Sequence, residues 1–146
     1  MKIKKPILAF IAAVAVAYLL TSVLGTQFVL ADIQSYGLPV SLPDRLAASL
    51  HDIHGLVPVL LMLVSAAYLV GFIIAVLGRR LLGGRHQYWI LAAGFASLPV
   101  AMMLMKLTMG ITPFALAGTN SGLLLIALCG LAGAWVFARL TQNRGA

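Results

Sequence analysis

The stretch best suited to chemistry in this sequence is His51-Asp52-Ile53-His54-Gly55, where a polar connecting segment meets a long apolar run. It holds two of the three histidines and one of the three acidic residues of the chain. Residues three apart on a helix lie near one face, so His51 and His54 could bind one metal ion, with Asp52 pointing elsewhere. The alternative is that the histidines cap a helix or hydrogen-bond at a surface, because the pair lacks a third ligand at fixed spacing.

Methionines form a second set of possible ligands. Met102 and Met105 share one face of a predicted helix, and Met62 follows His54 by two helical turns. Thioether sulfurs bind Cu(I), so a histidine layer above a methionine layer would suit copper. Methionine also fills gaps in apolar cores, and packing is the more common role.

Lys106 is an ionisable residue within an apolar run, which makes it a candidate for function. A lysine near a helix end also extends its ammonium group to the lipid headgroups or pairs with a carboxylate such as Asp52. As a binding site, Lys106 would act with His54 and Gln27 on an anionic ligand or a quinone headgroup. Haem held from one side by a histidine is a further hypothesis, so copper, haem and quinone all stay open as cofactors.

The composition predicts that these residues belong to an all-α integral membrane protein. Hydrophobic residues make up 62% of the 146 residues and charged residues 9%, against roughly 45–50% and about 25% in an average soluble domain. Four apolar runs are each long enough to cross about 30 Å of hydrocarbon. We therefore expect one domain over residues 1–146, a four-transmembrane-helix bundle with approximate spans at 6–30, 53–77, 88–109 and 121–140.

A short amphipathic interfacial helix is predicted between the first two spans, over about residues 42–52. Ser41 precedes Pro43 and Asp44, and both of these suit the first turn of a helix. One helical face then carries an apolar series at spacings of four, four and three: Leu42, Leu46, Leu50 and Ile53. Such a helix would lie on the membrane surface.

The basic residues predict the orientation of the bundle. Most of them flank the spans on one side: Lys2, Lys4, Lys5, Arg79, Arg80, Arg85, Arg139 and Arg144. The loops of the other side hold Arg45 alone, together with all three acidic residues, Asp32, Asp44 and Asp52. Because cytoplasmic loops carry the excess of Lys and Arg, we expect a bacterial inner-membrane protein with both termini in the cytoplasm.

The basic N-terminal segment and the net charge of the chain each have an alternative interpretation that we favour less. A basic start followed by an apolar stretch also occurs in signal peptides, but this run exceeds the usual 7–15 residues, so we expect it to remain as the first span. The net charge of +7 does not predict nucleic-acid binding, because the basic residues flank apolar runs instead of forming a stripe on one face.

Small residues on two of the spans are expected either to hold the bundle together or to bind a neighbouring subunit. Small residues four apart, which let helices approach closely, occur in the first run at Ala13 and Ala17 and in the last at Gly130 and Ala134. Two tyrosines lie well inside the apolar runs, and we expect them to donate hydrogen bonds between helices or to line a narrow cavity: Tyr18 and Tyr68.

No sequence motif assigns an activity. The chain has no glycine-rich phosphate loop, no Cys-x-x-Cys pair and no recognisable nucleophile elbow, which leaves an enzyme uncertain and less favoured. Its length and four-span plan are similar to those of small bacterial inner-membrane proteins such as the DoxX-like quinone-linked subunits, without any shared motif. We expect a non-enzymatic accessory or interaction subunit that packs with other membrane subunits or with itself. The alternative is an outer-face redox or ligand-binding protein that uses His51, His54 and Lys106.

Overall fold

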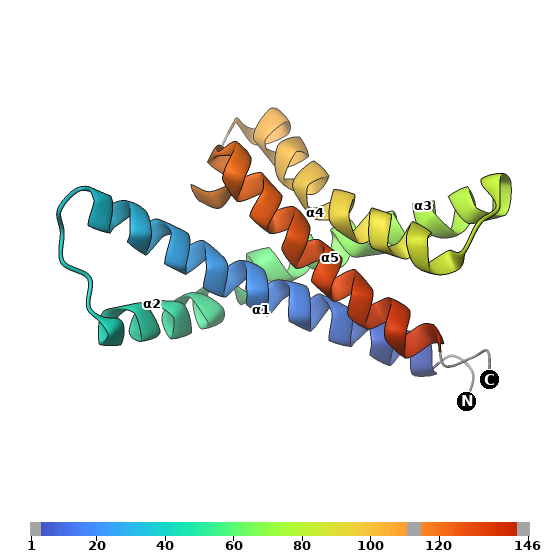
Figure 1. Cartoon of the computed structure of the whole chain (residues 1–146), viewed down its shortest axis with the longest axis horizontal. Coiled ribbons are helices and arrows are strands. Elements are labelled where there is room, and N and C mark those ends of the chain that lie inside the picture. Colours follow the sequence, from blue (N-terminus) through green and yellow to red (C-terminus); the bar gives the residue numbers. More distant parts are fainter. Residues whose placement is uncertain (1–3, 111–114, 143–146) are drawn as a thin grey trace.

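The computed structural model describes residues 4–110 and 115–142, and these are helical almost throughout (Figure 1). The helices are α1 (Lys4–Ser35), α2 (Leu42–Gly55), α3 (Met62–Leu82), α4 (His86–Met109) and α5 (Asn120–Gln142). A π-helical turn, Val57–Leu61, leads into α3, and a 3-10 turn, Ala115–Gly118, precedes α5. The described ranges contain no strand, so the all-α prediction is confirmed.

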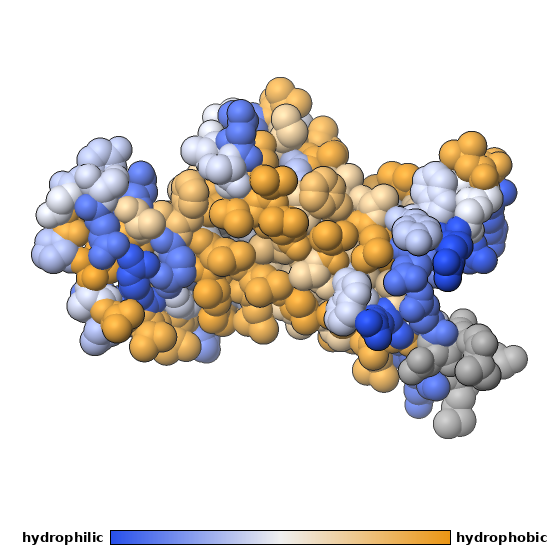
Figure 2. All heavy atoms as spheres, in the orientation of Figure 1, coloured by the Kyte–Doolittle hydropathy of each residue, from blue (hydrophilic) through white to orange (hydrophobic). Residues whose placement is uncertain are grey.

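Four helices are long and apolar enough to cross a membrane: α1, the continuous helix Val57–Leu82, α4 and α5. Figure 2 shows a broad apolar band across the middle of the molecule, with hydrophilic residues gathered toward its ends. The chain is therefore a multi-pass membrane protein with a four-helix bundle. The first helix continues to Ser35, beyond the expected end near residue 30, so its last turns extend past the apolar band.

The second apolar helix begins at Val57, later than the expected start at residue 53. Pro58 lies in the π-helical turn at this start, where its missing N–H leaves one helical hydrogen bond unmade. Because this turn separates α2 from α3, His51 and His54 both belong to α2 and not to a membrane span.

α2 begins with a capping box, at the start that the sequence predicts. The Asp44 amide donates to the Ser41 hydroxyl at 3.3 Å, and the Ser41 amide donates to the Asp44 carboxylate at 3.0 Å. Hydrogen bonds from the Ser41 hydroxyl and then from its backbone N–H hold the pKa of Asp44 below its usual value. The cap fixes where the polar connection ends and α2 starts.

α5 packs closely against both α1 and α4, and it lies between them (Figure 1). An added Cβ at Gly130 would lie 2.2 Å from the carbonyl oxygen of Gly94, and one at Gly94 would lie 2.1 Å from the Cβ of Ala134. On the side of α1, an added Cβ at Gly133 would lie 2.6 Å from the carbonyl oxygen of Ala13. The small-residue faces predicted for the first and last spans are thereby confirmed as packing surfaces.

Two tyrosines connect helices inside the bundle. The Tyr68 hydroxyl of α3 donates to the carbonyl oxygen of Gly130 at 2.6 Å, and its ring stacks on Phe72 with the centroids 5.0 Å apart. The Tyr18 hydroxyl of α1 donates to the carbonyl oxygen of Ile53 in α2. The prediction that both tyrosines donate hydrogen bonds between helices is confirmed.

The described basic residues other than Arg45 and Lys106 gather at the end of the bundle where the chain termini and the α3–α4 turn lie (Figure 1). They are Lys4, Lys5, Arg79, Arg80, Arg85 and Arg139. We refer to this as the basic end, and to the end that carries α2 as the acidic end. Lys2 and Arg144, which the sequence places on the same side, lie outside the described residues.

We predict that Gly130→Ala destabilises the bundle by about 1–3 kcal/mol, the range for overpacking a close contact. The added methyl group would meet the Gly94 backbone, which cannot rotate away as a side chain can. Thermal unfolding of the purified protein in a mild detergent, followed by circular dichroism, measures the effect.

Gly25→Ala is the matched control, because an added Cβ at Gly25 meets nothing within 4 Å. This variant should be as stable as the wild-type protein or slightly more stable, since alanine has a higher helix propensity than glycine. Equal unfolding temperatures for the two variants would contradict the close α4–α5 contact.

Candidate functional site

Hydrogen bonds between the end of α1 and α2 form a polar layer at the acidic end. Gln27 donates to the Ser49 hydroxyl at 3.1 Å and accepts from Arg45 at 2.7 Å. The Thr26 hydroxyl donates to the Asp52 carboxylate at 2.7 Å. Arg45, Ser49 and Asp52 are spaced by four and three, so one face of α2 points toward α1.

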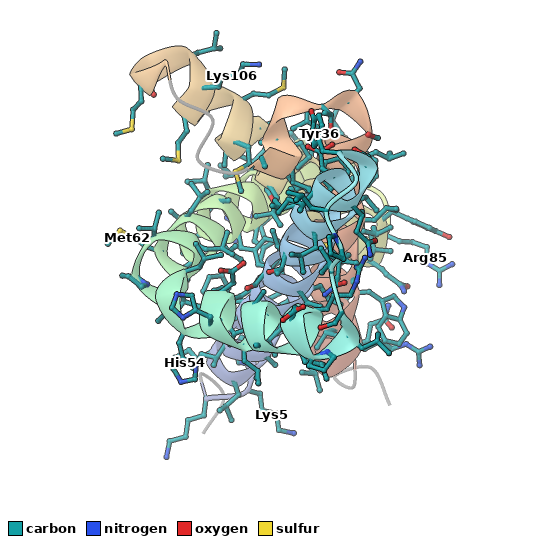
Figure 3. The ribbon with its side chains drawn as sticks, turned by 90° about the vertical axis from the view of Figure 1, so that its left-hand side faces the viewer. Lys5, Tyr36, His54, Met62, Arg85 and Lys106 are labelled. Atoms are coloured by element: carbon teal, nitrogen blue, oxygen red, sulfur yellow. The ribbon has the colours of Figure 1, made fainter. Side chains whose placement is uncertain are left out.

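This register leaves both histidines of α2 on its other side. His51 and His54 are exposed, and the nearest polar partner of His54 Nδ1 is the Leu50 carbonyl oxygen at 3.4 Å. Lys106 is also exposed, and Figure 3 places it at the opposite edge of the view from His54. Two residues that lie far apart in a projection are at least as far apart in space. The structure therefore does not bring Lys106 and His54 together. Gln27 is occupied by Arg45 and Ser49 instead of joining them.

The methionines do not form one layer either. Met62 is 72% exposed, whereas Met102 is 1% exposed and belongs to the apolar core. Met105 is half-buried and lines a groove between α3 and α4. Figure 3 shows Met62 on the outside of the bundle, so the three thioethers face different surroundings.

The metal and cofactor assignments therefore stay predictions from the sequence. Within residues 4–110 and 115–142, no three His, Cys, Asp or Glu side chains lie close enough to hold a metal ion. Among the residues that the structure describes, no other helix brings a His, Cys, Asp or Glu side chain to His51 and His54 as a third ligand. The reason is the register of α2, which directs Asp52 to Thr26.

A hollow of about 260 Å³ adjoins the polar layer, between α1, α2 and the 3-10 turn. Its polar side chains are Ser22, Thr26 and Asp52. Ser22 is 1% exposed, and its hydroxyl has no hydrogen-bond partner among the described residues. One carboxylate and two hydroxyls suit an ordered water molecule better than a cation, which needs more oxygen ligands.

An apolar groove with a volume of about 450 Å³ lies on the surface between α3 and α4. Its floor is a close helix contact, where an added Cβ at Gly71 would lie 3.0 Å from the Cβ of Ser97. We call this the α3–α4 groove. Small residues make up half of its lining: Ala66, Ala67, Gly71, Ala93, Ala96, Ser97 and Ala101. Small side chains at spacings of three and four on the second and third spans are the sequence signal for it.

The α3–α4 hairpin is also the least covered part of the bundle. In the most apolar stretch of α1 and of α5, 39% of the residues are buried inside the molecule. The buried share of the corresponding stretch is 28% in Val57–Leu82 and 22% in α4. α3 packs mainly on α4 and makes few contacts with α1. The α3–α4 groove therefore faces outward from the bundle at membrane depth.

The fold and the site define the class of this chain, a multi-pass membrane protein of four apolar helices with an outward groove. Comparison with known protein families, characterised proteins and solved structures finds no match.

We predict that Asp52→Ala loosens α2, because it removes the hydrogen bond from Thr26 to α2 and leaves the Thr26 hydroxyl only the Ser22 carbonyl oxygen of its own helix. A hydrogen bond to a charged group contributes about 1.5–3 kcal/mol. Hydrogen–deuterium exchange in a detergent micelle should show faster exchange of α2 amides, with little change in α5.

His51→Ala, one position earlier on the exposed side of α2, is the control and should leave the exchange of α2 unchanged. If His51→Ala loosened α2 as much as Asp52→Ala, the register that we describe for α2 would be wrong.

Proposed function

We propose that this protein is a non-enzymatic interaction subunit of a membrane assembly. Its docking surface is the α3–α4 groove, and the occupant is an apolar transmembrane helix of a partner subunit. One observation carries the proposal: the hairpin that is least covered within the bundle also bears the small-residue groove.

The size and lining of the groove favour a helix as its occupant. The lining extends from Ala93 to Thr108 along α4, which is about 23 Å at 1.5 Å per residue and so covers most of the hydrocarbon depth. Apolar attraction does not distinguish a helix from lipid chains, but small residues let two backbones approach and gain close packing. A lipid chain does not require such a surface.

The polar groups of the groove indicate the chemistry of the partner face. The Thr108 hydroxyl donates to the Leu104 carbonyl oxygen of its own helix at 2.8 Å. The Ser97 hydroxyl lies 3.5 Å from the Gly94 carbonyl oxygen, also in the same helix. Since these hydroxyls are directed to their own helix, the partner face should be apolar, with small or aliphatic side chains.

The proposed orientation puts the basic end in the cytoplasm of a bacterial cell and α2 on the outer surface of the inner membrane. The separation of charge supports it, because the described lysines and arginines other than Arg45 and Lys106 gather at one end, while Asp32, Asp44 and Asp52 lie toward the other. The alternative of an outer redox or ligand-binding site has less support, because His51, His54 and Lys106 do not converge.

We predict that a photo-crosslinking amino acid at Ala66 captures one reproducible membrane polypeptide in native membranes. Ala66 is exposed and lines the groove. Mass spectrometry identifies the adduct. A second substitution, Ala96→Leu, should abolish it, because the larger side chain fills the groove without adding charge.

Leu128→Trp is the control for the second substitution, since Leu128 is exposed on α5 away from the groove, and it should leave the adduct intact. An adduct that persists with Ala96→Leu would contradict docking in the groove. Crosslinking to a second copy of this chain alone would replace the partner subunit by a homo-oligomer.

A further inference from the structure

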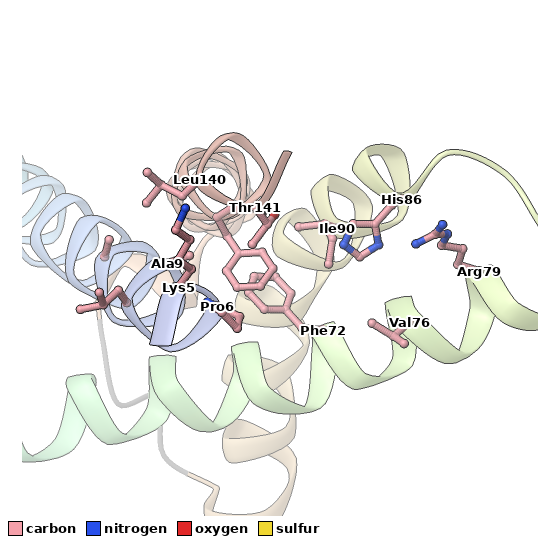
Figure 4. Close-up of a pocket in the computed structure, with 13 residues that line it drawn as sticks. Lys5, Pro6, Ala9, Phe72, Val76, Arg79, His86, Ile90, Leu140 and Thr141 are labelled. Atoms are coloured by element: carbon pink, nitrogen blue, oxygen red, sulfur yellow. Dashed lines mark hydrogen bonds between the residues drawn. The ribbon is translucent and has the colours of Figure 1, made fainter. Parts of the chain in front are cut away.

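A second hollow, with a volume of about 830 Å³, opens between α1, α3, α4 and α5 at the basic end (Figure 4). Three of its lining residues carry basic side chains from three different helices: Lys5 of α1, Arg79 of α3 and His86 of α4. Figure 4 shows His86 and Arg79 on one side of this hollow and Lys5 on the other. We call it the basic cavity.

No acidic side chain lies at the basic cavity. The chain has three acidic residues in all, and these are Asp32 in the last turns of α1 and Asp44 and Asp52 in α2, at the other end of the bundle (Figure 1). His86 also needs a hydrogen-bond partner, because its Nδ1 atom is buried and has none among the described residues. An anionic group with acceptor oxygens would balance the positive charge of the cavity and accept a hydrogen bond from this nitrogen.

The walls of the basic cavity are apolar and aromatic. Phe72 and Phe137 pack together with ring centroids 4.6 Å apart, and Ile90 of α4 lies beside them in the lining. A neighbouring hollow of about 510 Å³ between α1 and α3 shares four lining residues with the cavity: Pro6, Phe72, Val76 and Phe137. This neighbour is almost wholly apolar, with Arg80 as its one charged lining residue.

We propose that the basic cavity binds an anionic glycerophospholipid from the leaflet at the basic end. The phosphate group lies with Arg79 and His86, and an acyl chain lies in the apolar hollow between α1 and α3. A polar head and an apolar chain match a charged cavity that adjoins an apolar one. A zwitterionic lipid fits less well, because its ammonium group would meet Lys5 and the neighbouring arginines with no acidic side chain to offset them.

The test uses the full-length protein in a mild detergent, with bound lipid counted by native mass spectrometry. Dioleoyl phosphatidylglycerol should bind at least about tenfold more tightly than dioleoyl phosphatidylcholine, and Arg79→Gln should remove about a tenfold factor, as expected for the loss of a charge-assisted hydrogen bond. Arg85→Gln is the matched control: Arg85 has the same charge at the same end but lies over Tyr88, outside the cavity lining. Its effect should stay within about twofold.

Equal losses for Arg79→Gln and Arg85→Gln would overturn the proposal, because a general positive field would then explain the binding. Ala12→Phe provides an independent variant, since Ala12 lines the cavity and the substitution fills it while keeping every charge. It should weaken phosphatidylglycerol binding as strongly as Arg79→Gln does, and unchanged binding would also overturn the proposal. Oleate, a carboxylate with one chain, should compete poorly, and competition equal to that of phosphatidylglycerol would contradict the role of the phosphate.

Discussion

The close approach of α5 to α4 and α1 is the contact on which the rest of the structure depends. Lipid chains are as apolar as the helix surfaces, so the association of spans relies on close packing and on hydrogen bonds. Gly94, Gly130 and Gly133 provide both, because the absence of side chains brings the backbones together and leaves carbonyl oxygens accessible. Tyr68 uses one of these carbonyl oxygens, at Gly130, and thereby connects α3 to the same centre.

The α3–α4 groove and the basic cavity both follow from this central packing. α5 occupies the space between α1 and α4, so α3 is held mainly by α4 and leaves the outer face of the α3–α4 hairpin uncovered. At the basic end, where small residues give way to Phe72 and Phe137, the helices enclose the basic cavity instead of a close contact. The groove and the basic cavity are thus two places where the bundle does not fill its own surface.

The sequence predicted the class, the number of spans and the packing faces well, because these depend on composition and on spacing along one helix. Ala13 and Gly130 could be assigned from their neighbours four residues away. The positions of His51 and His54 could not, since they depend on which face of α2 meets α1. Hydrogen bonds of Thr26 and Gln27 decide that face, and partners so distant along the chain have no signal in a single sequence.

The basic cavity could not be predicted from the sequence, and the α3–α4 groove could be predicted only in part. Lys5, Arg79 and His86 are far apart along the chain, and the charges of Lys5 and Arg79 predicted topology instead of a shared cavity. Their common location depends on the angles between four helices. Small residues on α3 and α4 did carry a local signal for the groove, but only the uncovered position of this hairpin in the bundle distinguishes an outer groove from an internal contact.

A double-mutant cycle between Gly94 and Gly130 tests the central packing most directly. The free energy of unfolding is measured in one detergent for the wild-type protein, Gly94→Ala, Gly130→Ala and the double variant. The close contact predicts a coupling free energy of about 0.5–3 kcal/mol, because the first methyl group already separates α4 from α5 and the second then adds little. Effects that simply add, with no coupling beyond about 0.5 kcal/mol, would show that the two glycines are not in contact.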